Sequence, residues 1–226
     1  IIVGPANLKI GVRPNKLSKR ISMRFSPPDR ILLSCPVQMS SRLIKEFIKK
    51  NEYWLLDKKR RIDSLKKVEV GLKIPFKGKF FTICQSKKSS GTCSVVDSNI
   101  WVSSDERPVG IQIKDFFIKE VREAAIPMLD FYSQVLGKRY NDIKFKDTKS
   151  RWGSCSQDKS IMISWRLIMA PEQVLNYVLA HESAHLLYMN HSKSFWGTVG
   201  SLCKDYKAIR IWMRHEGGTL FNYKFV

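Results

Sequence analysis

The sequence predicts a mixed α+β protein in two parts: a β-rich lobe with one amphipathic helix over residues 1–114, and a more helical domain over residues 115–226. Two observations lead to this division. Apolar and polar residues alternate along much of the first part, which is typical of half-buried strands. In the second part, apolar residues recur at helical spacing. A chain of 226 residues with 43% hydrophobic content is long enough to bury a substantial core.

The first lobe is expected to begin with strands and continue with a helix. Apolar and polar residues alternate over residues 21–25 and again over 31–35, and the Ser-Pro-Pro-Asp segment between them predicts a turn. Helical spacing then predicts a helix from about Ser40 to Ile62, capped by a serine. The apolar side of this helix is expected to consist of Leu43, Ile44, Phe47, Ile48, Trp54 and Leu55.

Residues 68–114 are expected to form short strands without any catalytic motif. Breaks are predicted at Gly78 and in the Lys-Lys-Ser-Ser-Gly segment at 87–91. The predicted strands are Leu72–Phe76, Phe80–Cys84, Cys93–Val96 and Ile100–Val102. We therefore expect the first 114 residues to support a site elsewhere or to gather substrate.

The second domain is expected to open with a long helix and two strands. The helix begins at Lys114 or Asp115 and runs to about Leu136, with Gly137 ending it and Pro127 kinking it. The two strands are predicted over residues 142–147 and 160–165.

Two further helices are predicted towards the C-terminus. The first begins at Pro171, whose missing N–H costs nothing in a first turn. After a turn at Asn190, Ser192 is expected to cap a last helix. Gly217 and Gly218 mark the end of the predicted ordered structure.

The helix that follows Pro171 carries a His-Glu-x-x-His motif, formed by His181, Glu182 and His185. An α-helix turns about 100° per residue, so the two histidines lie on one face, one turn apart. Two imidazoles so placed can share a Zn²⁺ ion, and the neighbouring carboxylate can take a proton from water. His and Glu in an otherwise apolar segment would be costly to bury without such a partner.

A third histidine, His191, can complete the metal site only if the helix stops. Continued helix would carry it about 9 Å beyond His185, whereas Zn–N bonds measure about 2.0–2.1 Å. We therefore expect the chain to turn back near Asn190. Three protein ligands and an open fourth position are typical of a hydrolytic rather than a structural zinc site. The fourth histidine, His215, is interpreted as a solvated residue.

Charge and cysteine usage bear on partners and compartment. The 40 Lys and Arg residues against 20 Asp and Glu give a net charge of +20, which attracts polyanions such as nucleic acid or serves only solubility. Five widely spaced cysteines without a Cys-x-x-Cys pair favour reduced thiols and a cytoplasmic location. No apolar run reaches the roughly 18 residues that span a bilayer, so no membrane partner is expected.

Four segments together resemble the YgjP-like metallopeptidase domain, a group related to the SprT-like and WLM zinc peptidases. They are Arg-Trp-Gly-Ser-Cys at 151–155, Trp-Arg-Leu-Ile-Met-Ala-Pro at 165–171, His-Glu-Ser-Ala-His at 181–185, and Asn-His-Ser followed by Phe-Trp at 190–196. The basic hairpin and the Tyr-Trp pair at 53–54 resemble the family's N-terminal part as well.

The resemblance implies a zincin-like α+β catalytic domain that binds one Zn²⁺ ion through His181, His185 and His191, with Glu182 as general base. Zinc-dependent hydrolysis of a peptide bond in a peptide or protein substrate is the leading hypothesis. A further donor is needed to stabilise the oxyanion, and the candidates are Tyr188, Arg151 and Arg166, each of which could instead pack or pair with an acid.

Two alternatives remain open. Some relatives are described as metal-dependent pyrophosphatases acting on UTP, although phosphoryl chemistry usually employs Mg²⁺ held by carboxylates, and the sequence contains no acidic cluster. The second alternative is a nucleic-acid-binding module with a structural or vestigial zinc site. The presence of Glu182 argues against it, because a structural site requires no base.

Overall fold

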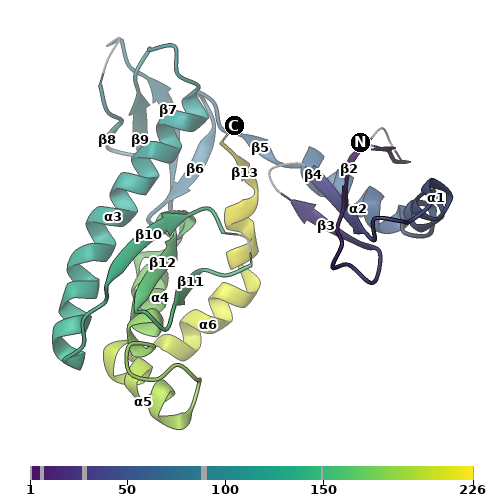
Figure 1. Cartoon of the computed structure of the whole chain (residues 1–226). Helices are drawn as coiled ribbons and strands as arrows, with labels where there is room; N and C mark the ends of the chain where they lie inside the picture. The colour runs from purple at the N-terminus through teal and green to yellow at the C-terminus, as the bar shows by residue number, and fades with distance from the viewer. Residues whose placement is uncertain (1, 6–7, 27–29, 88–90, 149, 226) are drawn as a thin grey trace. The chain divides into compact units, whose positions relative to one another are not determined.

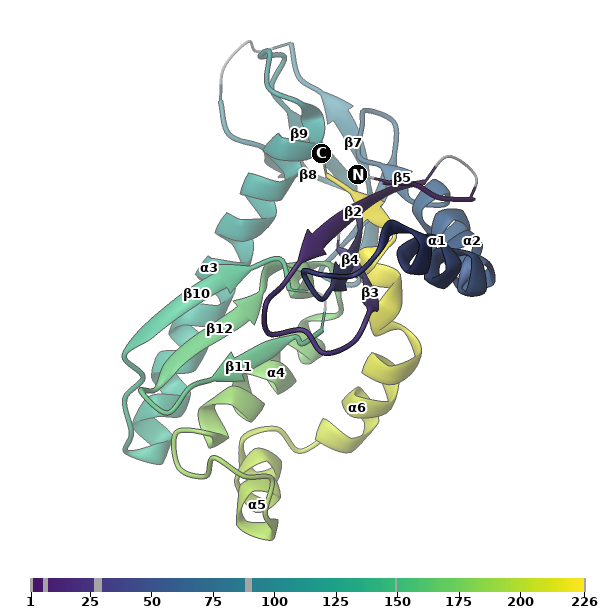
Figure 2. The same ribbon diagram turned by 45° about the vertical axis from the view of Figure 1, so that its right-hand side comes forward.

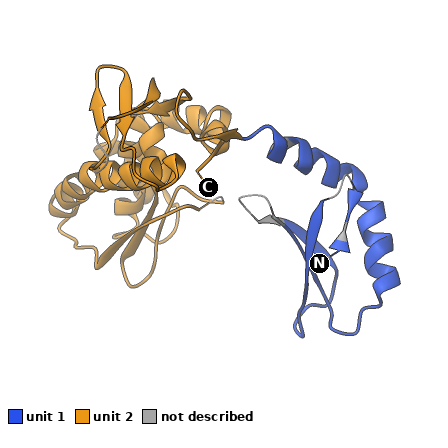
Figure 3. Cartoon of the chain, turned by 90° about the horizontal axis from the view of Figure 1, so that it is seen from above, with its two compact units in different colours: residues 1–65 blue, residues 66–226 orange. Residues whose placement is uncertain are grey.

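The computed structural model describes residues 2–5, 8–26, 30–87, 91–148 and 150–225. Residues 27–29 of the predicted turn and residues 88–90 of the predicted break lie outside the described residues. The chain divides into two compact units, residues 1–65 and 66–226 (Figure 3). Both contain helices and strands, which confirms the α+β fold class. The expected boundary after residue 114 falls inside the second unit, because the strands before it share a core with the helices after it.

The first unit is a four-stranded sheet with two helices. Its strands are β1 (Ile2–Val3), β2 (Lys9–Pro14), β3 (Ser22–Ser26) and β4 (Arg30–Cys35), in the order β1-β2-β4-β3. β4 pairs parallel with β2 and antiparallel with β3. The predicted alternation is confirmed on β4, where Ile31 and Leu33 are fully buried and pack with Ile44, Ile48 and Leu55 from the helices.

The single helix predicted from Ser40 to Ile62 is two helices, α1 (Ser41–Lys50) and α2 (Glu52–Asp63). The break lies at Asn51, whose side-chain amide donates to the Phe47 carbonyl at 2.8 Å and so competes with the helical hydrogen bonds. Ser40 is the N-cap, as predicted, and accepts from the Leu43 amide at 3.4 Å. The prediction that Leu43 faces inward is wrong, since its side chain is 49% exposed.

The second unit begins with β5 (Lys66–Lys67) and a four-stranded sheet, ordered β6-β7-β9-β8. Its strands are β6 (Lys73–Phe76), β7 (Lys79–Gln85), β8 (Ser94–Val96) and β9 (Asn99–Val102), close to the predicted ranges. Phe76 stacks on Phe117 of the following helix with ring centroids 5.5 Å apart. This contact joins the sheet to the main core of the second unit.

The long helix, α3, spans Val109–Leu136 and begins several residues before the predicted start. Its early residues pack against the C-terminal tail, where an added Cβ on Gly110 would collide with the backbone of Phe225. The helix continues through Pro127 and ends at Gly137, which adopts φ 61° as the predicted terminator. No helix among the described residues is both long and apolar enough to cross a membrane.

A three-stranded sheet and four helical segments follow α3 in the second unit (Figures 1 and 2). The sheet has the order β10-β12-β11, with β10 (Asp142–Lys146), β11 (Gly153–Cys155) and β12 (Ser160–Ser164). Its edge strand β11 was not predicted. The helical segments are η2 (Trp165–Met169), α4 (Glu172–Ala184), α5 (Lys193–Leu202) and α6 (Tyr206–His215). In both views α4 lies behind the sheet, and it contacts β11 and β12.

The C-terminal tail is ordered, so the prediction that structure ends at Gly217 and Gly218 is wrong. The tail forms η3 (Gly217–Phe221) and β13 (Tyr223–Lys224), which pairs in parallel with β5. The physical reason is burial at long range: Leu220, Tyr223 and Phe225 all insert into the main core. All five cysteines are free thiols, as expected.

Candidate metal centre

Helix α4 places the histidine motif at its last turn. Its first turns are fixed by a buried apolar face that includes Val174, Val178 and Leu179. The helix contacts α3 on one side and β11 on another. The motif therefore sits on a rigid element that is packed on several sides, as a site with fixed geometry requires.

The three predicted ligands meet at one point. One ring nitrogen from each of His181, His185 and His191 lies within 4.8 Å of the others. The Nε2 atoms of His181 and His191 are 3.2 Å apart. Two nitrogens on a tetrahedral zinc ion, each about 2.0–2.1 Å from the metal, would be separated by about 3.3–3.4 Å. The spacing of the imidazoles therefore fits a shared zinc ion with little adjustment.

The turn after α4 brings His191 back, but it begins earlier than predicted. The helix ends at Ala184 rather than near Asn190, and the amides of Leu187 and Tyr188 close the turn on the Ala184 carbonyl at 3.1 and 3.0 Å. Ser192 then caps α5 by accepting from the Phe195 amide, as predicted. It does not cap the last helix, because α6 follows.

Ring orientation is set by contacts outside the metal position. The His185 Nδ1 atom lies 2.9 Å from the Tyr188 carbonyl, which can only accept, so this nitrogen carries the proton and Nε2 is left free as a ligand. The ring of His185 packs on Phe195 with centroids 4.5 Å apart. His191 stacks on Trp196 at 5.7 Å. Both aromatic rings belong to α5 and also contact His181, at 4.9 and 5.7 Å, so this helix packs against all three histidines.

The imidazole of His181 is neutral in this environment. Burial, together with the neighbouring His185, His191 and Arg210, lowers its pKa from 6.5 to about 3. Neutral imidazole is the form that binds metal, so the ring is ready for a cation at neutral pH. The Tyr177 hydroxyl lies 3.5 Å from its Nδ1 atom, one turn earlier on the same helix face.

Glu182 is enclosed beside the histidines. Its side chain is 5% exposed, and Gly153 of β11 is packed directly against it: an added Cβ there would lie 2.5 Å from Oε1. The Cys155 amide of the same strand donates a hydrogen bond to the carboxyl group. Burial raises the pKa of Glu182 to about 8, and the charge of Arg151 and the Cys155 hydrogen bond oppose this rise. A bound cation would oppose it further by favouring the ionised form.

The three candidate oxyanion donors have different surroundings. Arg151 is exposed, and its charge reaches Glu182. Tyr188 is 37% exposed and contributes its backbone carbonyl to the His185 ring. Arg166 is 4% exposed and pairs with Asp147 at 2.7 and 3.1 Å.

The same Arg166 guanidinium also donates to the carbonyls of Leu220 and Tyr223 at 3.0 and 3.3 Å. It lies over the ring of Trp165 at 4.7 Å. All of these partners belong to the core or the tail. Arg166 therefore anchors the C-terminal tail, which corrects its candidacy as a substrate contact.

Sequence reasoning missed a pocket beside the centre. It has a volume of about 290 Å³ and is lined by His181 and Glu182 from α4, Gly153 from β11, and Arg210 and Arg214 from α6. The available signal was the pair of arginines four residues apart, which share one face of a helix. That helix was not predicted, so the signal was not used.

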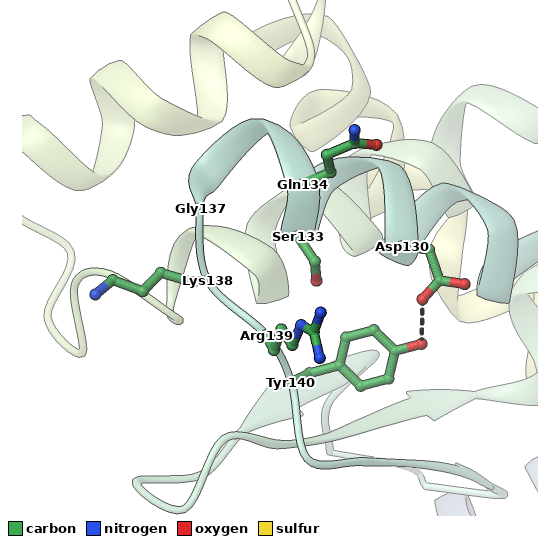
Figure 4. A pocket seen from close by; sticks show the side chains of 7 residues that line it. All are labelled: Asp130, Ser133, Gln134, Gly137, Lys138, Arg139 and Tyr140. Carbon is green, nitrogen blue, oxygen red and sulfur yellow. Dashed lines mark hydrogen bonds between the residues drawn. The ribbon is translucent and has the colours of Figure 1, made fainter.

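A larger cavity of about 790 Å³ lies at the end of α3, away from these residues (Figure 4). Figure 4 shows Tyr140 and Ser133 at this cavity, where the Tyr140 hydroxyl donates to Asp130 at 2.7 Å. None of the three histidines lines it, and neither does Glu182. Size alone would thus select a cavity that lacks the chemistry of the metal centre.

Comparison with known proteins identifies a family for most of the chain. A family model described as YgjP-like, metallopeptidase domain, matches residues 19–216, a range that contains every residue of the metal centre. No curated protein matches the chain. Among solved structures, the metallopeptidase zymogen abylysin of Pyrococcus abyssi is 24% identical, with a TM-score of 0.35, and the match covers 40% of this chain and 93% of that one.

Proposed function

Because the chain belongs to the YgjP-like metallopeptidase family, we propose that it is a zinc-dependent peptidase in which His181, His185 and His191 hold one Zn²⁺ ion and Glu182 is the general base. The observation that carries this proposal is the meeting of three imidazoles within 4.8 Å beside a buried carboxyl group. Three protein ligands leave one position open for water or substrate, as in hydrolytic zinc sites.

The donor set favours zinc over other divalent cations. All three donors are imidazole nitrogens, which suit Zn²⁺, whereas Mg²⁺ and Ca²⁺ prefer oxygen ligands. Among the residues that the structure describes, these three histidines are the group of potential ligands close enough to hold an ion. Nickel and copper also accept imidazole, so metal analysis of the purified protein is the direct check.

The chain's own groups divide the remaining work. A bound zinc ion supplies Lewis acidity, which polarises the scissile carbonyl and makes water acidic near neutral pH. Glu182 accepts the proton of the attacking water and delivers it to the leaving amine. Gly153 permits the carboxyl group to approach the strand, and the Cys155 amide fixes one of its oxygens. Because Glu182 is almost fully buried, bulk solvent has little access to its carboxyl group.

Replacement of the base tests the mechanism. Glu182→Gln keeps the volume and the hydrogen-bond acceptor, so the protein should retain zinc but lose turnover by about 100- to 10,000-fold, the usual contribution of a positioned base. The matched control is Glu172→Gln, an exposed position in the first turn of the same helix, which should leave turnover unchanged. Turnover of a labelled casein and zinc content are measured for both. Equal turnover in zinc-loaded Glu182→Gln would refute the assignment.

Replacement of a ligand tests the metal site. His191→Ala should weaken zinc retention, because only two of the three imidazoles would remain to bind the ion. The control is His215→Ala, which removes an exposed histidine on α6. Zinc content after dialysis against a mild chelator separates the two. Full occupancy in His191→Ala would contradict the three-histidine site.

The two alternative functions can be tested in the same samples. Nucleotide pyrophosphatase action predicts release of pyrophosphate from UTP, and the nitrogen ligands give this reaction no dedicated Mg²⁺ site among the described residues. A nucleic-acid-binding role for the +20 charge predicts an affinity that falls steeply with salt. A purely structural zinc site needs no base, so it would not explain why a carboxyl group is buried beside the histidines.

A further inference from the structure

The pocket beside the metal centre contains more positive than negative charge. Arg210 and Arg214 contribute from α6, and the acid that faces them is Glu182. The carboxyl group of Glu182 is held by the Cys155 amide and packed against Gly153, so its place is fixed by the strand. The pocket therefore offers two guanidinium groups to a ligand that enters from solvent.

Neither arginine forms an ion pair with a described carboxylate. Arg210 is partly buried and lies over the ring of Trp196 at 4.3 Å, a contact that fixes its side chain without neutralising its charge. Arg214 follows four residues later, on the same helix face. Two cations at this spacing repel each other, and an anion bound between them would attract both and offset this repulsion.

The position and the volume of the pocket indicate which part of a substrate would carry the anion. His181 and Glu182 line the same pocket, so a group bound there is attached within about one residue of the bond being hydrolysed. A volume of about 290 Å³ is at the lower limit of typical small-molecule sites, which suits a single side chain. Guanidinium groups recognise carboxylates through paired, charge-assisted hydrogen bonds.

We propose that this pocket is a specificity subsite, in which Arg210 and Arg214 bind a carboxylate of the substrate peptide next to the scissile bond. The substrates are then peptides or proteins that carry Asp or Glu at that position, or that end there with a free C-terminal carboxylate. This inference rests on the proposed peptidase function and adds the substrate class to it. The net charge of +20 would attract the same acidic segments at longer range.

The test compares matched peptides. The first set consists of amidated peptides of equal length, in which each position in turn is Glu, Gln or Lys. The second set consists of peptides that end in glycine with a free C-terminal carboxylate. Mass spectrometry reads the cleavage sites of the zinc-loaded full chain, and kcat/KM follows for the best pairs. We expect Glu to be preferred over Gln by about 10- to 100-fold at one position, the usual effect of a charged hydrogen bond. The set with a free C-terminus shows whether a main-chain carboxylate serves as well.

Variants connect the preference to the pocket. Arg214→Glu should abolish the preference for Glu and favour Lys, and Arg210→Met should reduce it. Lys204→Glu is the control, because Lys204 is exposed just before the helix, lies outside the pocket and undergoes a comparable change of charge. A preference that survives Arg214→Glu, or that Lys204→Glu removes equally, would overturn the proposal while leaving the peptidase function intact.

A binding measurement decides the case in which no peptide is cleaved. In the Glu182→Gln protein, the side-chain Nε–Hε signals of Arg210 and Arg214 are followed by NMR as the Glu or Gln peptide is added. Shifts of these signals with the Glu peptide alone support the subsite even if the proposed function fails. Equal shifts with both peptides, no shifts, or a response to UTP in place of peptide would overturn it.

Discussion

Gly153→Ala perturbs the general base without touching a metal ligand. An alanine Cβ at this position would lie 2.5 Å from Oε1, 2.7 Å from Cγ and 2.8 Å from Cδ of Glu182. Carbon atoms pack at about 3.5–4.0 Å, so the side chain of Glu182 would have to move by roughly 1 Å. A misplacement of about 1 Å in a catalytic constellation can cost about 100-fold in rate. We expect that loss of turnover, with zinc content unchanged.

The assay measures three quantities on one preparation: turnover of a labelled casein, zinc per chain and the free energy of unfolding. Overpacking should also lower the stability of Gly153→Ala by about 1–3 kcal/mol. The matched control is Gly197→Ala on α5, where an added Cβ meets nothing within 4 Å. Alanine favours a helix interior over glycine by about 0.8–1.0 kcal/mol, so this control should become more stable and keep its turnover.

One result would refute the reasoning directly. If Gly153→Ala folds, binds zinc and turns over within about threefold of the parent chain, then the position of Glu182 against β11 does not matter for catalysis, since a displacement of roughly 1 Å should cost far more. Loss of zinc together with turnover would instead show that the strand supports the ligands as well as the base.

Three further predictions concern the other candidate residues. Tyr188→Phe should leave zinc content and turnover unchanged, because the structure uses the backbone carbonyl of Tyr188 rather than its hydroxyl; a loss of turnover above tenfold would restore the hydroxyl as an oxyanion donor. Arg166→Met should lower the free energy of unfolding by about 3 kcal/mol in urea denaturation, at the lower end for a broken buried pair because Asp147 is partly exposed. Arg151→Met, at an exposed position, should change stability by less than about 0.5 kcal/mol.

The candidate metal ligands could be predicted because their geometry is local. The relation of His181 to His185 follows from the pitch of one helix, and the apolar positions of that helix predicted its burial. The need for a turn before His191 followed from bond lengths alone. Strand alternation worked for the same reason in β4, where the pattern reports a face of the element itself.

Features that depend on distant segments were not accessible in this way. Gly153 has a role only because β11 packs against α4, and a three-residue strand leaves almost no periodic signal. The division of the chain at residue 65 depends on contacts between the β6–β9 sheet and α3, which no local pattern reports. The paired glycines at 217 and 218 predicted the end of ordered structure, yet the ring of Phe225 lies 5.0 Å from the ring of Trp165 in the core.

The end of α4 shows why even a local prediction can be misplaced. Leu186 and Leu187 extend the apolar spacing, so the pattern favours a helix that runs on towards Asn190. In the structure Leu186 is buried but Leu187 is 38% exposed, because the turn after Ala184 rotates it outward.

The chain tightens after Ala184, where the amides of Leu186 and Leu187 donate to carbonyls three residues earlier, and the ring of His185 donates to the Tyr188 carbonyl. The bond that stabilises the turn therefore also fixes which nitrogen of His185 faces the metal position. Helix termination and ligand orientation have one physical cause here, so the early end at Ala184 is part of how His191 reaches its place.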